Sequence, residues 1–284
     1  MRLRIQRFDP AKQVKQHRVI IIIGRRGTGK SILLKDLCYH LRDRWDFGIA
    51  CTPTEETAET FRSMMPDSWV FDGFDMNRLE QMMLMQRANQ TRGKERSLFL
   101  LTDDCGFDRG SFRGRAVRDL MMNGRHYHIC YMSCLQYCLD MTPDIRSQID
   151  YVFCLKDNIL SNRQRLWRAF FGMFERYEDF SRTLDRCTDN YACLVLDQTT
   201  PTSKIEDCVF WYRAGCNIPK FAIGKPVFHR LAARHAMTAK ERRHATEVRL
   251  QAKTVTDKRV TEVERTDRRG RVIREQQEDS VLIT

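Results

Sequence analysis

The stretch that decides the fold is Val19-Ile-Ile-Ile-Ile-Gly-Arg-Arg-Gly-Thr-Gly-Lys-Ser31. Residues 19–23 are apolar and β-branched, which is typical of a strand buried on both faces. Residues 24–31 match the pattern G-x-x-x-x-G-K-[ST], and apolar residues then recur at helical spacing over residues 31–44. A strand, a glycine-rich loop and a helix in this order predict a phosphate-binding loop (P-loop). The alternative, a chance match in a loop, does not explain the flanking strand and helix.

Each residue type in this loop suits a nucleoside triphosphate. Glycines let the backbone wrap a phosphate chain without a clash at Cβ, and the helix N-terminus presents N–H groups to it. Lys30 is expected to reach the β- and γ-phosphates, and the Ser31 hydroxyl to bind Mg²⁺. The predicted nucleotide-binding residues are Gly24, Arg25, Arg26, Gly27, Thr28, Gly29, Lys30 and Ser31.

Beyond the loop, short apolar segments alternate with helical patterns. Strands are expected at residues 47–51, 97–101, 127–132, 151–155, 191–196 and 208–212. Single helices are expected at 54–65, 78–89 and 117–123, and more than one helix over 162–186. This alternation predicts an α/β fold with a mainly parallel sheet flanked by helices. The expected domains are a basic arm at 1–17, an ATPase domain at 18–216, and a basic tail at 217–284 with a polar helix at 238–253 and a mobile remainder.

The net charge of +12 sits at the two ends of the chain. Residues 1–18 carry six Lys/Arg against one Asp, and residues 217–284 carry sixteen Lys/Arg against nine Asp/Glu. A neutral body with basic ends indicates attraction to a polyanion such as nucleic acid, although such ends can also serve solubility alone. No apolar run approaches the twenty residues that a bilayer span needs.

Polar residues follow two further expected strands. Asp103 and Asp104 end the segment Ser97-Leu-Phe-Leu-Leu-Thr-Asp-Asp104, and Gln136 follows the strand that begins near Tyr127. Asp103 is expected to face Mg²⁺, and Asp104 to orient or deprotonate the attacking water. Asp104 could instead cap the next loop. Gln136 could sense the γ-phosphate or be an ordinary surface residue.

Eleven cysteines, mostly inside apolar runs, read as buried free thiols in a reducing compartment. Cys130, Cys134 and Cys138 recur every four residues, but no CxxC pair or His–Cys cluster accompanies them. We therefore interpret these three cysteines as small core residues and not as metal ligands.

From about Arg18 to Ala214 the chain resembles the genome-packaging ATPases of large cytoplasmic DNA viruses, in the FtsK–HerA division of P-loop ATPases. The segments that carry the resemblance are, in order, Ile23 to Ser31, Thr52-Pro-Thr-Glu55, Asp103-Asp-Cys105, Met122-Asn-Gly-Arg-His-Tyr127, Gln136-Tyr137, Ile149-Asp-Tyr-Val-Phe153, Gly172-Met-Phe174, Asn190-Tyr-Ala-Cys-Leu-Val195 and Val209-Phe-Trp-Tyr212. Two positions differ from the family pattern. Asp104 stands where a Glu is usual, and Cys138-Leu-Asp-Met-Thr-Pro143 replaces a proline-rich stretch.

The resemblance implies a RecA-like core in which the strand leading to Gln136 lies between the P-loop strand and the Asp103 strand. It implies that Gln136 is the polar sensor and that Arg125 reaches the nucleotide of a neighbouring subunit, with Arg146 as a rival. A structural arginine paired with an acid is the alternative for Arg125. It further implies a homo-oligomeric ring that uses Mg²⁺ and ATP to move double-stranded DNA into a capsid or portal-type vertex, in the host cytoplasm or the virion.

Phosphate contacts to DNA are expected from basic residues after the acid pair, Arg109, Arg113, Arg115 and Arg118, although a solvated helix face explains them equally well. Two other functions remain open at this point. One is a P-loop nucleotide or nucleoside kinase, for which the second aspartate would be superfluous. The other is a non-catalytic DNA-binding virion protein whose P-loop only switches assembly.

Overall fold

The computed structural model describes residues 3–105, 114–136, 142–202 and 204–234, and the backbone of 260–266 and 272–278. The chain forms two compact units, Met1–His235 and Ala236–Thr284. The first unit is built on a nine-stranded sheet in the order β1-β9-β8-β7-β2-β6-β5-β3-β4. Its strands are β1 (Gln6–Arg7), β2 (Val19–Ile23), β3 (Phe47–Cys51), β4 (Val70–Phe71), β5 (Leu98–Asp103), β6 (Ile129–Leu135), β7 (Tyr151–Cys154), β8 (Ala192–Asp197) and β9 (Val209–Arg213).

The centre of the sheet is parallel, as the alternation of strands and helices predicts. β2 pairs in parallel with β6 on one side and with β7 on the other, and β5 pairs in parallel with β6. The expected position of the Gln136 strand between the P-loop strand and the Asp103 strand is therefore confirmed. Only β7–β8 and β8–β9 pair antiparallel in this sheet among the described residues.

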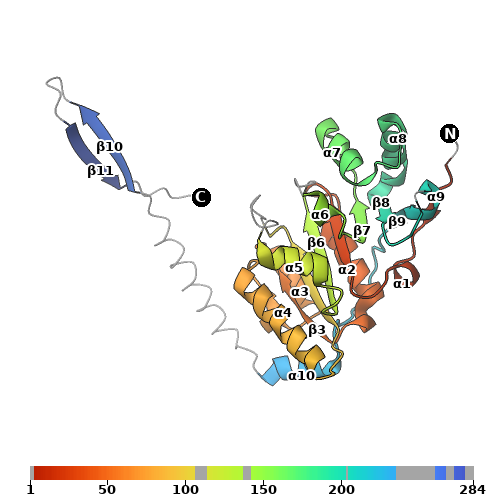
Figure 1. Ribbon diagram of the computed structural model, residues 1–284, viewed down its shortest axis with the longest axis horizontal. Coiled ribbons are helices and arrows are strands. Elements are labelled where there is room, and N and C mark those ends of the chain that lie inside the picture. The colour runs from red at the N-terminus through yellow and green to blue at the C-terminus, as the bar shows by residue number, and fades with distance from the viewer. Residues whose placement is uncertain are drawn as a thin grey trace. The chain divides into compact units, whose positions relative to one another are not determined.

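Two apolar layers cover the faces of the sheet, because successive side chains of a strand point to opposite faces. In β2, Val19, Ile21 and Ile23 enter one layer, whereas Ile20 and Ile22 enter the other. The first layer is closed by α4 (Met76–Thr91), α5 (Arg115–Asn123), α7 (Leu160–Phe170) and α8 (Tyr177–Cys187). The second is closed by α2 (Lys30–Leu41), α3 (Glu55–Arg62) and α10 (Pro226–Arg234), and Figure 1 shows α4 and α5 together on one side of the sheet.

Shorter helices lie between these elements: α1 (Pro10–Gln13), α6 (Pro143–Arg146), α9 (Ile205–Cys208), and the 3₁₀ turns at Arg42–Arg44, Asp67–Trp69 and Asp189–Tyr191. The helix of the P-loop is tied to β9, next to the edge strand β1 on the same face of the sheet, by its buried Asp36. That carboxylate accepts hydrogen bonds from the Tyr212 hydroxyl and, at 3.1 Å, from the Gly215 N–H. Burial, together with the nearby Asp36, raises the pKa of Tyr212.

The first unit is longer than the ATPase domain expected at residues 18–216. β1, in the basic arm, pairs in parallel with β9, and Phe8 and Val14 are buried in the second layer. Beyond residue 216, Ile223 and Phe228 are buried in the same layer. Both terminal segments carry too few apolar residues to show periodicity, so the sequence alone does not reveal that they belong to the core.

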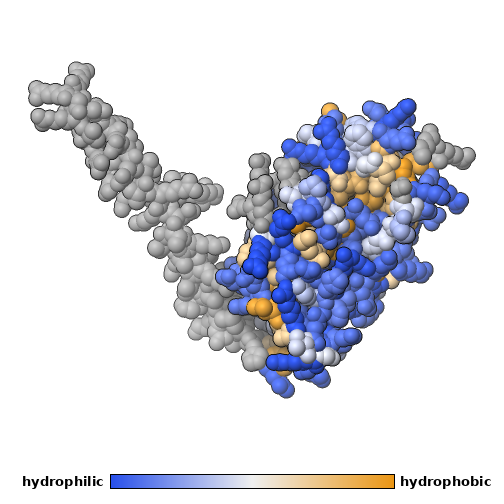
Figure 2. Space-filling model, viewed as in Figure 1, coloured by the Kyte–Doolittle hydropathy of each residue, from blue (hydrophilic) through white to orange (hydrophobic). Residues whose placement is uncertain are grey.

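The second unit contains an antiparallel pair of strands, β10 (Val260–Thr266) and β11 (Val272–Glu278), where a mobile tail was expected. Val and Thr recur in β10, and β11 begins with Val and Ile; all three residue types favour strands. The helix expected at 238–253 lies outside the described residues. Among the described residues, no helix is both long and apolar enough to cross a membrane. Figure 2 shows a mostly hydrophilic face with a small apolar area near β7 and β8.

Candidate nucleotide-binding site

The P-loop begins where β2 ends and closes at the first turn of α2. Gly27 and Gly29 have φ angles of +79° and +96°, which a residue with a Cβ adopts only with strain. A Cβ on Gly24 would lie 2.6 Å from the Thr28 hydroxyl oxygen, so this position also needs glycine. Gly24 N–H donates to the Leu135 carbonyl at 3.0 Å and anchors the loop to β6.

The side chain of Lys30 bridges the start of the loop. Its ammonium donates to the carbonyls of Gly24 at 2.8 Å and Arg25 at 3.1 Å. Lys30 is the first residue of α2 and Ser31 the second, so both lie at the positive end of the helix. The loop thus gathers an ammonium group, a hydroxyl and the N–H groups of a helix N-terminus in one place, and this cradle suits a phosphate group.

Asp103 is the last residue of β5 and is buried beside this cradle. Thr57, on α3, donates to its Oδ2 at 2.9 Å. Burial raises the pKa of Asp103, against the Thr57 hydrogen bond and the nearby Lys30 ammonium, which lower it. Asp103 also pairs in register with Cys134 of β6, whose thiol likewise lowers the pKa of Asp103. The register of the sheet brings the P-loop and this aspartate together, because Ile23 pairs with Leu135 and Asp103 with the adjacent Cys134 of β6.

Asp104 and Gln136 meet across the ends of two neighbouring strands. The Gln136 amide donates to Asp104 Oδ2 at 2.6 Å, although the two residues are 32 positions apart. Asp104 has a left-handed backbone with φ of +46°, which aspartate tolerates better than most residues and which turns the chain after β5. Both side chains are partly exposed, so water can reach the carboxylate.

Proteins of large DNA viruses are similar to this chain over most of its length. Uncharacterized protein L437 of Acanthamoeba polyphaga mimivirus is 32% identical over 219 residues, which are 74% of this chain and 76% of that protein. Uncharacterized protein 088R of Invertebrate iridescent virus 3 is 32% identical over 195 residues, 69% of this chain and 75% of that protein. No family model matches the sequence.

A solved structure shares the fold. The genome packaging NTPase B204 from Sulfolobus turreted icosahedral virus 2, in complex with AMPPCP, is 14% identical with a TM-score of 0.51, and the match covers 73% of this chain and 100% of that one. At this identity the likeness concerns the fold alone, which is that of a P-loop ATPase. The chain belongs to one family with these proteins of large DNA viruses.

The residues at the P-loop of this viral-family protein suit Mg²⁺. Ser31 offers a hydroxyl oxygen and Asp103 a carboxylate, and such oxygen ligands are the ones that Mg²⁺ prefers, together with waters and substrate phosphates. Asp103 Oδ1 is buried and accepts no N–H or O–H hydrogen bond from the described residues. An ion at this point would satisfy that oxygen, so the donor set fits the metal.

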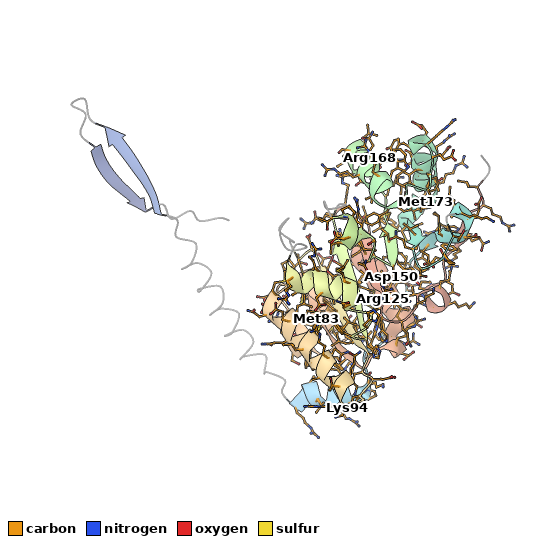
Figure 3. The ribbon with its side chains drawn as sticks, in the orientation of Figure 1. Met83, Lys94, Arg125, Asp150, Arg168 and Met173 are labelled. Atoms are coloured by element: carbon orange, nitrogen blue, oxygen red, sulfur yellow. The ribbon has the colours of Figure 1, made fainter. Side chains whose placement is uncertain are left out.

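Arg125 lies at the amino ends of the parallel strands, whereas the P-loop lies at their carboxyl ends. It is exposed in the turn before β6, close to Asp150 at the start of β7, as Figure 3 shows. Burial raises the pKa of Asp150, and Arg125 works against that effect, as does Arg18, whose guanidinium pairs with Asp150 at 3.1 Å. The seven residues of β6 separate the two ends of the strands by about 20 Å. Arg125 therefore cannot reach the P-loop of its own chain.

The other predicted arginines have different surroundings. Arg146 is the last residue of α6 and is partly buried. Arg118, on α5, pairs with Asp144 at 2.5 Å, whereas Arg115 begins the same helix and is exposed. Arg109 and Arg113 lie outside the described residues.

Sequence reasoning missed Thr57, which holds Asp103 in place from α3. The two residues are 46 positions apart and belong to no common motif, so only the packing of α3 against β5 reveals the contact. The prediction that Cys130 and Cys134 are core residues is confirmed, since both are buried in β6. Burial raises the pKa of both thiols, that of Cys130 to about 12. Cys138 lies outside the described residues.

Proposed function

We propose that this protein is an Mg²⁺-dependent ATPase that drives double-stranded DNA into a viral capsid. The observation that carries the proposal is the hydrogen bond between Gln136 and Asp104 at the end of β5 and β6, beside the P-loop and the buried Asp103. A hydrolase needs a carboxylate positioned for water at this place, whereas a kinase positions a substrate hydroxyl. The sequence resemblance to genome-packaging ATPases and the fold shared with the genome packaging NTPase B204 support packaging as the process that hydrolysis serves.

Each side chain then has a role in hydrolysis. Lys30 and the loop N–H groups bind the β- and γ-phosphates, while Ser31 and Asp103 would hold Mg²⁺, which neutralises phosphate charge. Asp104 accepts a proton from the attacking water. Gln136 holds the Asp104 carboxylate through its amide and senses the γ-phosphate.

Coupling to DNA requires more than one subunit. Arg125 lies at the ends of the strands away from its own P-loop, so it could complete only the site of a neighbouring subunit. There its guanidinium would neutralise charge on the transferred phosphoryl group. We therefore propose a homo-oligomeric ring around duplex DNA, docked at a capsid vertex in the host cytoplasm. Basic residues such as Arg115 would contact the DNA phosphates without reading sequence.

ATP hydrolysis by the full chain, with and without linear duplex DNA over a salt series, tests this function. We expect stimulation by DNA that fades as salt rises, because phosphate contacts release counterions. Asp104→Asn should lower kcat by about 10²- to 10⁴-fold with ATP affinity kept. Asp43 is an exposed acid in the turn that follows α2. Asp43→Asn is therefore the matched control and should hydrolyse ATP normally.

The same assay separates the alternatives. Activity that ignores DNA but consumes added nucleosides would indicate a kinase and contradict the proposal. Normal hydrolysis in Asp104→Asn would remove Asp104 from the mechanism. Arg125→Ala should bind ATP normally yet hydrolyse poorly, and mixing it with Asp104→Asn subunits should restore part of the activity, because each variant supplies the half-site that the other lacks.

A further inference from the structure

The turn before β8 holds an exposed aromatic ring on a strained backbone. Asn190 and Tyr191 are consecutive residues with φ of +54° and +59°. Asparagine tolerates this left-handed conformation, but tyrosine adopts it rarely, at a cost of order 1–3 kcal/mol. Tyr191 is nevertheless 74% exposed, the most exposed of the large apolar side chains in the described part of the chain. Burial in the core therefore does not explain the strain.

Tyr191 lies against the P-loop. A Cβ built on Gly29 would be only 3.6 Å from Cδ1 of the Tyr191 ring. The ring lines a hollow of about 460 Å³ whose walls are residues 25–28 of the P-loop, Lys156 and Asn158 after β7, and residues 188 and 190–192. Lys156 pairs with Asp189 at 3.0 Å and thereby joins two of these walls. The hollow is thus continuous with the phosphate cradle.

The sheet order decides which part of a nucleotide can occupy this hollow. Asp103 and Asp104 end β5, which lies beyond β6 on one side of the P-loop strand β2. The γ-phosphate must face these acids. The nucleoside end must then leave the P-loop on the other side of β2, where β7 ends and β8 begins. That is the side on which Tyr191 and the hollow lie.

We propose that this hollow is the nucleobase subsite and that Tyr191 stacks against the base. The proposal rests on the proposed function, in which the P-loop binds a nucleoside triphosphate. Stacking of a base on an aromatic ring contributes about 1–3 kcal/mol and suits any base, because every base has a π-face. The exposed amides of Asn158 and Asn190, which line the same hollow, can hydrogen-bond to the base edge.

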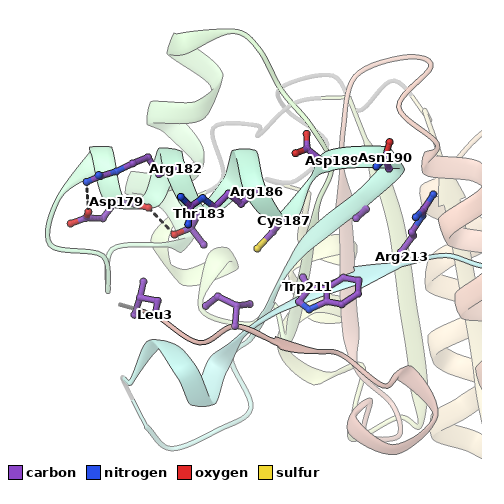
Figure 4. A pocket seen from close by; sticks show the side chains of 12 residues that line it. Leu3, Asp179, Arg182, Thr183, Arg186, Cys187, Asp189, Asn190, Trp211 and Arg213 are labelled. Carbon is purple, nitrogen blue, oxygen red and sulfur yellow. Dashed lines mark hydrogen bonds and ion pairs between the residues drawn. The ribbon is translucent and has the colours of Figure 1, made fainter. Parts of the chain in front are cut away.

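A second hollow on the other side of the same turn provides a control. It has a volume of about 560 Å³ and contains Trp211 of β9 and Arg186 of α8 (Figure 4). It shares Asn190 and Ala192 with the first hollow but includes none of the P-loop residues. Trp211 is therefore an aromatic residue close to the turn that should not touch a nucleotide.

The test compares ATP with inorganic tripolyphosphate, which has the phosphate chain and no base. Dissociation constants for both, with Mg²⁺, are measured on the full chain by calorimetry. We expect the wild type to bind ATP about 10-fold or more tightly than tripolyphosphate. Tyr191→Ala should lose most of this preference, and Tyr191→Phe and Trp211→Leu should keep it. Tripolyphosphate affinity should be unchanged in all variants, which also shows that each variant is folded.

A Tyr191→Ala protein with the preference of the wild type would overturn the base subsite alone. A wild type that binds neither ligand would overturn the proposed function, and the subsite with it.

Discussion

At the scale of single residues, Gly48 shows how closely the sheet is packed. It lies in β3 opposite Phe99 of β5, and a Cβ at this position would lie 2.2 Å from the Phe99 carbonyl oxygen. No side-chain movement can relieve a contact with backbone. The glycine is therefore required by the close approach of two strands and not by a turn.

We predict that Gly48→Ala lowers the free energy of unfolding by about 3 kcal/mol, because two strands must separate to admit one methyl group. Urea denaturation followed by circular dichroism measures the change. Gly73→Ala is the matched control, since a Cβ there meets nothing within 4 Å, and it should have little effect. Equal stability of the two variants would show that the strands are less tightly packed than the distance indicates.

At the scale of elements, an ion pair joins the segment before α10 to the start of β3. Lys225 pairs with the buried Asp46, whose Oδ2 accepts from Ser97 N–H at 2.7 Å. Burial works to raise the pKa of Asp46, but Lys225, Ser97 and Arg96 together lower it below its usual value. The ionised form of Asp46 therefore stabilises the folded protein. This contribution is complete above the unfolded pKa, near 3.9, and is lost as the pH falls through the folded pKa.

We predict that Lys225→Met costs about 1 kcal/mol at pH 7, a modest value because the lysine is more than half exposed. The cost should shrink as the pH falls through the lowered folded pKa of Asp46, because protonation of the carboxylate removes the ion pair. Unfolding free energies over a pH series from neutral to strongly acidic measure it, with Lys220→Met as the control. A cost that does not change with pH would mean that Lys225 stabilises the fold by packing instead of charge.

At the scale of the whole molecule, both ends of the first unit complete its core. Phe8 and Val14 precede the P-loop strand, and Ile223 and Phe228 follow the last strand of the sheet, yet all four are buried in one layer. Removing buried side chains of this size costs about 2–5 kcal/mol each. Their sum is comparable with the whole stability of a typical domain, about 5–15 kcal/mol.

We predict that a fragment of residues 1–235 unfolds cooperatively at nearly the temperature of the full chain, whereas a fragment of residues 18–216 does not fold stably. Differential scanning calorimetry of the two fragments measures this. A cooperative transition of the shorter fragment at the same temperature would show that the terminal segments only cover a core that is complete without them.

The sequence by itself determined the parts of this protein that depend on neighbours in the chain. β2 and β3 begin and end where the apolar runs do, at Val19–Ile23 and Phe47–Cys51. The P-loop follows from its glycines and from Lys30 and Ser31, and Asp103 and Asp104 from their place after an apolar segment. Local sterics and periodicity fix these features within about ten residues, so that a short stretch of sequence contains them.

Only the tertiary structure decided which distant residues meet. It joined Gln136 to Asp104, Thr57 to Asp103 and β1 to β9. It also put Arg125 at the ends of the strands away from the P-loop. It also laid Tyr191 against Gly29, 162 positions earlier in the chain. These contacts depend on the order of strands in the sheet. That order is set by the burial of both sheet faces together, a property of the whole unit that no local pattern contains.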